Sequence, residues 1–79
     1  MEIVNQEAQK FMHEGDKLIE KDKYEEALHC YEEAISIDQN DPALWNKKGI
    51  TLRSLGRYDE AVECFNKSLK ISPRDLDAS

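Results

Sequence analysis

Apolar side chains recur along the chain at steps of three and four residues, the spacing that places them on one face of an α-helix. The first such stripe predicts a helix from about Glu2 to Lys21, and its members are Val4, Ala8, Phe11, Gly15, Leu18 and Ile19. A polar break at 21–23 precedes a second stripe, made of Tyr24, Ala27, Leu28, Tyr31, Ala34, Ile35 and Ile37. Because the break is so short, we expect these two helices to form an antiparallel hairpin.

The second half of the chain predicts another hairpin. A third helix is expected to begin at Asp41-Pro42, because aspartate caps helix N-termini and proline fits the first helical position. This helix carries Leu44, Trp45, Gly49, Leu52 and Leu55, and it should end near Gly56, which readily adopts the left-handed conformation. A fourth helix is expected from Tyr58 until Pro73, with a stripe of Tyr58, Ala61, Val62, Phe65, Ser68, Leu69 and Ile71. The predicted fold class is therefore all-α.

Shifting the sequence by 34 residues aligns the two predicted hairpins. The pairs that are identical at this shift are Gly15/Gly49, Leu18/Leu52, Tyr24/Tyr58, Glu26/Glu60, Ala27/Ala61, Cys30/Cys64, Ile37/Ile71 and Asp41/Asp75. Further pairs match in size and polarity, namely Phe11/Trp45, Tyr31/Phe65, Ala34/Ser68 and Ile35/Leu69. We interpret the chain as a single domain (1–79) with two copies of one unit, 8–41 and 42–75, followed by the start of a third at 76–79.

A helix-turn-helix unit of this length and pattern resembles the tetratricopeptide repeat. The residues that carry the resemblance are Phe11, Gly15, Leu18, Tyr24, Ala27, Tyr31 and Ala34 in the first copy, and Trp45, Gly49, Leu52, Tyr58, Ala61, Phe65 and Pro73 in the second. The resemblance covers residues 8–75. It implies that the antiparallel hairpins stack as a short right-handed α-solenoid.

Two features depart from that family pattern. Gln39 stands where the family usually has the proline seen at Pro73, and Glu14 and Lys48 replace the usual leucine before the glycine. Neither change threatens the hairpins. The first is expected to loosen the turn at 38–41.

Gly15 and Gly49 lie inside predicted helices, where glycine costs about 1 kcal/mol relative to alanine. We expect glycine at these positions only where a neighbouring helix passes too close for a side chain. Ala27 and Ala61 would then be the small residues of that neighbouring helix. The aromatic residues, including Trp45, are then packing residues that fill the wider spaces beside the close crossing.

Composition and charge narrow the function classes. A chain of 79 residues with 35% charged and 39% apolar residues forms one small domain with a thin core, which leaves no room for a two-domain enzyme. The net charge of −6 argues against duplex nucleic acid and anionic membranes as partners. No apolar run approaches the roughly 18 residues of a spanning helix, and Met1 to Gln9 has no signal-peptide character. We expect a cytoplasmic protein without nucleic-acid or membrane partners.

The sequence offers little catalytic or metal-binding chemistry. Cys30 and Cys64 are too few and too far apart for a disulfide framework, and with His13 and His29 they lack the short spacings of a zinc site. His29 and Cys30 point about 100° apart on a helix. There is no glycine-rich phosphate loop. We therefore expect no enzyme activity, no metal and no cofactor.

Binding of a protein or peptide is the function that this sequence favours. In a stack of helical hairpins the first helix of each lines a concave groove, which accepts an extended peptide or a partner helix. By the resemblance, the groove residues are Gln9, Met12, His13, Asp16, Ile19 and Glu20 from the first unit and Ala43, Asn46, Lys47, Ile50, Arg53 and Ser54 from the second. A ligand's apolar side chains would contact Met12, Ile19, Ala43 and Ile50.

The charges expected in this groove lie on two sides, with Asp16 and Glu20 on one and Lys47 and Arg53 on the other. They would suit a ligand with a basic and then an acidic segment. Family members that hold a free carboxylate use a Lys and an Asn on the first inner helix and an Asn on the second. The matching places here are Met12, Asp16 and Lys47, so this clamp is absent.

Two other classes of function stay open. Each hairpin exposes an apolar flank that a following hairpin covers. The fourth helix would offer Phe65, Leu69 and Ile71, so the chain is expected to be a piece of a longer array or a self-associating assembly module. Self-association would give a homo-oligomer through this face, either head to tail or by exchange of a helix. An RNA-binding helical repeat of the pentatricopeptide kind is the third candidate, but those repeats are slightly longer and have basic inner faces.

The charge distribution gives the self-association hypothesis a direction. Residues 1–41 carry 12 acidic and 4 basic side chains, a net charge of −8, whereas 42–79 carry 5 acidic and 7 basic, a net charge of +2. Such complementary charges would steer the first unit of one molecule towards the second unit of another. The alternative is that both are ordinary solvated faces.

Overall fold

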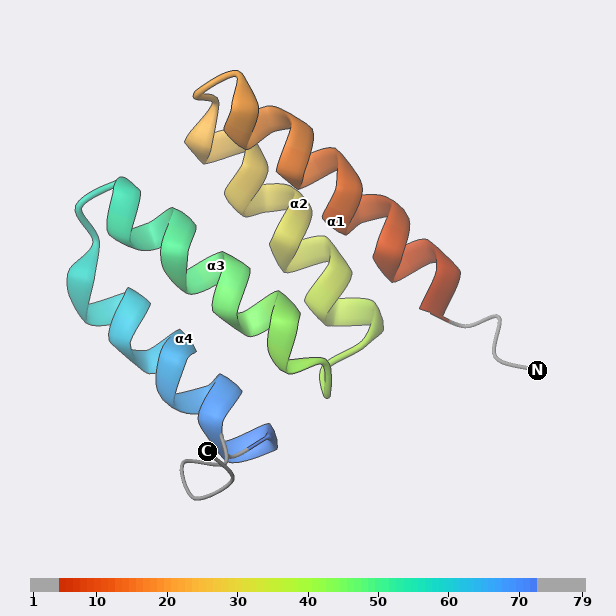
Figure 1. Cartoon of the computed structure of the whole chain (residues 1–79), viewed down its shortest axis with the longest axis vertical. Helices are drawn as coiled ribbons and strands as arrows, with labels where there is room; N and C mark the ends of the chain where they lie inside the picture. Colours follow the sequence, from red (N-terminus) through yellow and green to blue (C-terminus); the bar gives the residue numbers. More distant parts are fainter. Residues whose placement is uncertain (1–4, 73–79) are drawn as a thin grey trace, which may run out of the picture.

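A computed structural model describes residues 5–72 as four α-helices (Figure 1). These helices are α1 (Asn5–Glu20), α2 (Tyr24–Ile37), α3 (Pro42–Ser54) and α4 (Tyr58–Ile71), and this part of the chain contains no strand. Helices that follow one another in sequence pack against one another. The all-α fold class predicted from the periodicity is therefore confirmed.

The helix boundaries agree closely with the sequence prediction. The second helix spans the predicted stripe, and the third and fourth begin at the predicted residues, whereas the first ends at Glu20, one residue early. The predicted start at Glu2, the stop at Pro73 and the third unit at 76–79 lie outside the described residues.

The same turn closes both hairpins, with a left-handed residue after the first helix of each. Gly56 has φ +81°, as its position predicted, and Asp22, at the equivalent place in the first hairpin, has φ +60°. In both turns the next residue's N–H reaches back to a leucine carbonyl: Lys23 N to Leu18 O and Arg57 N to Leu52 O, each 2.9 Å. This is the hydrogen bond of the Schellman helix ending.

The connection between the two hairpins is fixed by side chains at the start of α3. The N–H of Ala43 donates to the Asp41 carboxylate at 3.0 Å, which confirms Asp41 as the N-cap. The indole Nε1 of Trp45 donates to the carbonyl of Gln39 at 2.9 Å. Although Gln39 replaces a proline, its carbonyl is held by the following helix.

The core consists of two clusters that share Trp45. One contains Ala8, Ala34, Ile35 and Leu44, and the other contains Leu28, Leu52, Ala61 and Cys64. Trp45 is partly buried and packs against both clusters, which confirms its predicted packing role. Each cluster joins residues of α2 to residues of α3, so the apolar contact between the hairpins organises the core.

The helix-interior glycines make room for aromatic rings, which corrects the expectation that they allow two helices to cross closely. A Cβ built on Gly15 would lie 2.6 Å from the nearest ring atom of Tyr31, and one on Gly49 would lie 2.6 Å from the ring of Phe65. Real Cβ atoms essentially never make such contacts. Each glycine therefore seats the aromatic side chain of the paired helix, and Ala27 and Ala61 are not the nearest neighbours.

Candidate binding surfaces

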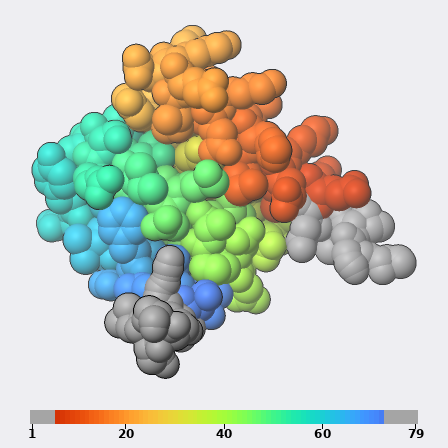
Figure 2. Space-filling model, viewed as in Figure 1, coloured from red at the N-terminus to blue at the C-terminus, as the bar shows by residue number. Residues whose placement is uncertain are grey.

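A groove lies between α1 and α3, with α2 at its base, and we call it the α1–α3 groove. Its volume is about 240 Å³, and its lining residues are Asp16, Ile19, Tyr24, Tyr31, Lys47, Ile50, Thr51 and Ser54. In the space-filling view α1 (red to orange) and α3 (green) lie on either side, and a small part of α2 (yellow) is visible between them (Figure 2). Five of the twelve predicted groove residues line this groove.

A polar network ties the three helices together at the base of the groove. Tyr31, only 2% exposed, donates its hydroxyl hydrogen to Asp16 Oδ1 at 2.5 Å, and Lys47 Nζ lies 3.3 Å from the same oxygen. Burial, and then the hydrogen bond to Asp16, raise the pKa of Tyr31 well above its ordinary value of 10. The tyrosine is therefore a neutral donor at physiological pH, and it accepts no proton from a ligand.

The ion pair changes the electrostatic expectation for the groove. Asp16 and Lys47 were expected to present separate charges to a ligand, but they compensate each other across the groove. Both side chains are partly exposed, so the pair stabilises the fold by at most about 1 kcal/mol. What remains for a ligand at this point is an apolar wall of Ile19 and Ile50, with Ile50 41% exposed.

The other predicted groove residues lie elsewhere on the molecule. Ala43 and Asn46 line a second depression of about 450 Å³, the α3–α4 hollow, whose remaining lining residues are Pro42, Phe65, Ser68, Leu69 and Ser72. Met12 packs against the core cluster around Leu44. The exposed residues Gln9, His13, Glu20 and Arg53 line neither depression.

The three residues of the predicted self-association face line two depressions. Phe65 and Leu69 both line the α3–α4 hollow. Ile71 instead lines a depression of about 500 Å³ between α2 and α4, the α2–α4 hollow, together with Glu32, Ile35, Ser36, Gln39, Asn40, Trp45, Lys67 and Lys70. Phe65 and Leu69 therefore line one depression and Ile71 another.

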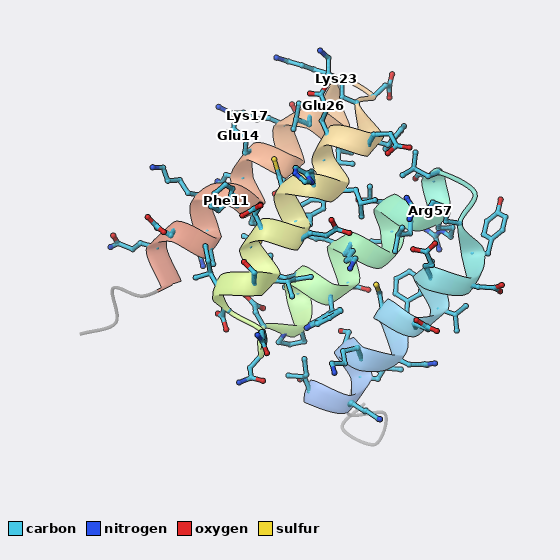
Figure 3. All side chains as sticks on the ribbon, turned by 180° about the vertical axis from the view of Figure 1, so that it is seen from behind. Phe11, Glu14, Lys17, Lys23, Glu26 and Arg57 are labelled. Carbon is cyan, nitrogen blue, oxygen red and sulfur yellow. The ribbon has the colours of Figure 1, made fainter. Side chains whose placement is uncertain are left out.

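A further depression, the α1–α2 hollow, lies between α1 and α2. It has a volume of about 660 Å³ and is lined by Phe11, Glu14, Leu18, Glu25, Glu26, His29, Cys30 and Glu33. Figure 3 shows Phe11 and Glu14 on α1, with Glu26 of α2 on the same side of the molecule. Sequence reasoning did not single out this acidic hollow, although its glutamates recur at helical spacing.

Tyr24, Tyr31 and Thr51 are groove residues that sequence reasoning missed. It assigned the inner face to the first helix of each unit, which leaves out Tyr24 and Tyr31 of α2, and on α3 it did not include Thr51. The hydroxyl of Thr51 is satisfied internally, since Oγ1 donates to the carbonyl of Lys47 at 2.9 Å. The sequence did contain one indication that Tyr31 contacts Asp16. The first unit has both a hydroxyl donor, Tyr31, and a carboxylate acceptor, Asp16, whereas the second unit has neither, because Phe65 and Ile50 stand at these positions.

Reactive side chains are few in the described part of the chain. Cys30 and Cys64 are both free thiols, and burial raises the pKa of each, which makes them weak nucleophiles. Within residues 5–72, no three side chains of His, Cys, Asp or Glu gather closely enough to hold a metal ion. Of the helices described, none combines the length and the apolar character needed to cross a bilayer.

The fold and its surfaces define a small all-α protein of stacked helical hairpins with shallow grooves between them. A family model described as the CABIN1 N-terminal domain matches residues 4–78, and the chain belongs to this family. Among curated proteins, none matches the sequence.

The assignment to the tetratricopeptide repeat family is therefore wrong. The residue pattern behind that assignment reflects the packing of stacked helical hairpins. It consists of a small residue opposite an aromatic ring and a turn that contains a left-handed residue. Such a pattern describes the packing of a unit and does not distinguish between families that share it.

Proposed function

We propose that this chain is a protein–protein interaction module, without catalytic activity, that binds a peptide or a partner helix in the α1–α3 groove. The observation that carries this proposal is the apolar wall of Ile19 and Ile50 above a polar base whose charges are already paired. An apolar patch with satisfied polar neighbours favours burial against a ligand, because no charge has to be desolvated without a partner.

The size of the groove limits what enters it. A volume of about 240 Å³ accommodates one or two apolar side chains of a peptide or a partner helix, while the rest of the ligand stays outside it. The ligand is therefore a segment that presents an apolar side chain to Ile19 and Ile50. The exposed Glu20 and Arg53 lie on α1 and α3 respectively, so charged ligand residues are selected outside the groove.

The test compares two exposed isoleucines. Peptides selected from a random phage-displayed library on the wild-type protein serve as probes, and fluorescence anisotropy measures their affinity. Ile50→Glu should weaken binding at least tenfold, because it places a charge on the apolar wall. Ile37→Glu is the matched control, since Ile37 is 39% exposed and lies outside the groove. Unchanged affinity in Ile50→Glu, with helicity intact by circular dichroism, would contradict the groove assignment.

Assembly through α4 is the second candidate function. The observation that favours it is the exposure of Leu69, which is 49% exposed although the equivalent Ile35 is 7% exposed. The face of α4 thus keeps an apolar residue where the same face of α2 is covered by α3.

A further inference from the structure

The joint between the two hairpins is one interface made of two different faces. On one side, α2 contributes Leu28 and Ile35, which are 5% and 7% exposed. On the other side, Leu52 and Cys64 pack with Leu28, and Leu44 packs with Ile35. We call the α2 side of this interface, with Leu28 and Ile35, the outer face, and the opposite side, with Leu44, Leu52 and Cys64, the opening face. The outer face of the first hairpin therefore packs against the opening face of the second.

The outer face is present a second time on α4. A shift of 34 residues takes Leu28 to Val62 and Ile35 to Leu69. These residues are 54% and 49% exposed, so an apolar pair that is buried between the hairpins is repeated on the surface.

Most of the opening face is also present a second time, on the first hairpin, although Lys10 takes the place of Leu44. The same shift relates Trp45, Leu52 and Cys64 of the internal joint to Phe11, Leu18 and Cys30. All three of these equivalents line the α1–α2 hollow. Both halves of the joint are thus available on one molecule, at opposite ends of the helix stack.

Charge makes these two free faces complementary. In the internal joint, Ser36 and Lys67 line the same depression beside Trp45, and Lys67 Nζ lies 5.5 Å from the centre of the Trp45 ring. The equivalents of Ser36 and Lys67 on the free faces are Lys70 and Glu33. A joint formed between two molecules would therefore bring a lysine of one towards a glutamate of the other.

A second pair of positions adds to this complementarity. Glu32 and Lys48 form an ion pair across the internal joint, at 3.6 Å. Their equivalents are Asn66 and Glu14, an amide donor and a carboxylate acceptor. The net charges of +2 on residues 42–79 and −8 on residues 1–41 act in the same direction over longer range.

We propose that this chain binds a second copy of itself head to tail, with Val62 and Leu69 of one copy seated in the α1–α2 hollow of the next. This inference rests on the assembly function and is independent of the α1–α3 groove. Because the contact joins two different faces, it is heterologous, and each added copy again presents a free outer face. The association therefore extends the stack of hairpins and does not stop at a symmetric dimer.

The test uses two variants that each lose one face. Val62→Asp/Leu69→Asp removes the outer face, and Glu14→Lys/Glu33→Lys makes the α1–α2 hollow basic. All four positions are exposed, so both variants should keep the wild-type helicity. In sedimentation velocity, the wild-type protein should form species that grow with concentration, whereas each variant alone should stay monomeric.

Mixing the two variants gives the decisive result. One retains an intact hollow and the other an intact outer face, so the 1:1 mixture should form a dimer that grows no further. A wild-type protein that stays monomeric up to millimolar concentration would overturn both the assembly function and this inference. If the wild-type protein associates but the mixture does not, the head-to-tail geometry is wrong and assembly uses another face. The variant Ile50→Glu should associate like the wild type, which separates this result from the test of the groove.

Discussion

The two hairpins share their turn geometry and their glycine-to-ring contacts, but a buried polar pair in the first is replaced by an apolar pair in the second. In the first, Tyr31 is buried and donates to Asp16, which also pairs with Lys47 of α3. In the second, Phe65 and Ile50 take these places, and Ile50 is 41% exposed. The first hairpin is covered by α3, whereas no described helix follows α4.

This difference shows that the residues repeated in both units fix the packing of the two helices within a hairpin. The helix that packs on the hairpin from outside decides which of its other side chains find a partner. The carboxylate of Asp16 has a partner because Lys47 approaches from the next hairpin. At the equivalent place in the second hairpin an isoleucine contributes to the wall of the α1–α3 groove. Asp16 of the first unit forms an ion pair with the second hairpin, whereas the equivalent Ile50 of the second unit is exposed in the groove.

The largest expected effect comes from truncating the same position in each unit. Ile35→Ala should lower the free energy of unfolding by about 2–4 kcal/mol, because the side chain is buried between the hairpins. Leu69→Ala should cost less than about 1 kcal/mol, since half of that side chain is already exposed. Urea unfolding of dilute protein, followed by circular dichroism, measures both. Equal losses would show that α4 is covered as well as α2.

Substitution of the two interior glycines should give a smaller contrast. Gly15→Ala overpacks against Tyr31, which is fixed by burial and by Asp16, and the strain of about 1–3 kcal/mol exceeds the gain of about 1 kcal/mol in helix propensity. Gly49→Ala should be close to neutral, because the Phe65 ring lines the α3–α4 hollow and has room to move. Thermal unfolding of both variants checks the order. A larger loss in Gly49→Ala would contradict this explanation.

Removing the Tyr31 hydroxyl tests the contribution of the Tyr31–Asp16 hydrogen bond, which the second hairpin lacks. Tyr31→Phe should lower stability by about 1 kcal/mol at pH 7, because Asp16 loses a donor. The matched change, Phe65→Tyr, should alter stability by less than about 0.5 kcal/mol, since Ile50 offers no acceptor. Urea titrations measure both differences.

The pH dependence of the wild-type stability, relative to that of Tyr31→Phe, follows from the raised pKa of Tyr31. The folded protein holds the tyrosine proton more tightly than the unfolded chain does, so this stabilisation is complete below pH 10 and is lost as the pH rises above it. The stability of the wild type should therefore fall towards that of Tyr31→Phe above pH 10. A difference that stays constant with pH would contradict the tyrosine assignment.

Much of the fold follows from local rules that the sequence makes visible. The Asp41 cap, the left-handed Gly56 and the extent of α2 depend on residues within one or two turns of each other. The 34-residue shift then relates one hairpin to the other. The cap, the turn and the helix were predictable because each depends on a short stretch of chain, and the shift was visible because the same pattern of residues occurs twice.

The candidate site was less predictable, because it depends on where side chains of different helices meet. Periodicity places Asp16 and Lys47 on their helices, but it does not show that their side chains meet at 3.3 Å. It likewise places Tyr31 on the buried stripe without showing that its hydroxyl reaches the base of the α1–α3 groove. The family assignment failed for a related reason, since packing residues describe the hairpin and not its family.

The smallest expected effect lies in the two turns, where the left-handed residue is Asp22 in one and Gly56 in the other. Asp22 adopts φ +60°, a conformation that costs a side-chain-bearing residue more than glycine. Its carboxylate accepts only an exposed, 3.3 Å hydrogen bond from Tyr24, so Asp22→Gly loses little and should raise stability by about 0.5 kcal/mol. Gly56→Asp, at φ +81°, should lower stability by a similar amount. Thermal melts of the two variants should shift in opposite directions, and a shift in the same direction would mean that the turns are not equivalent.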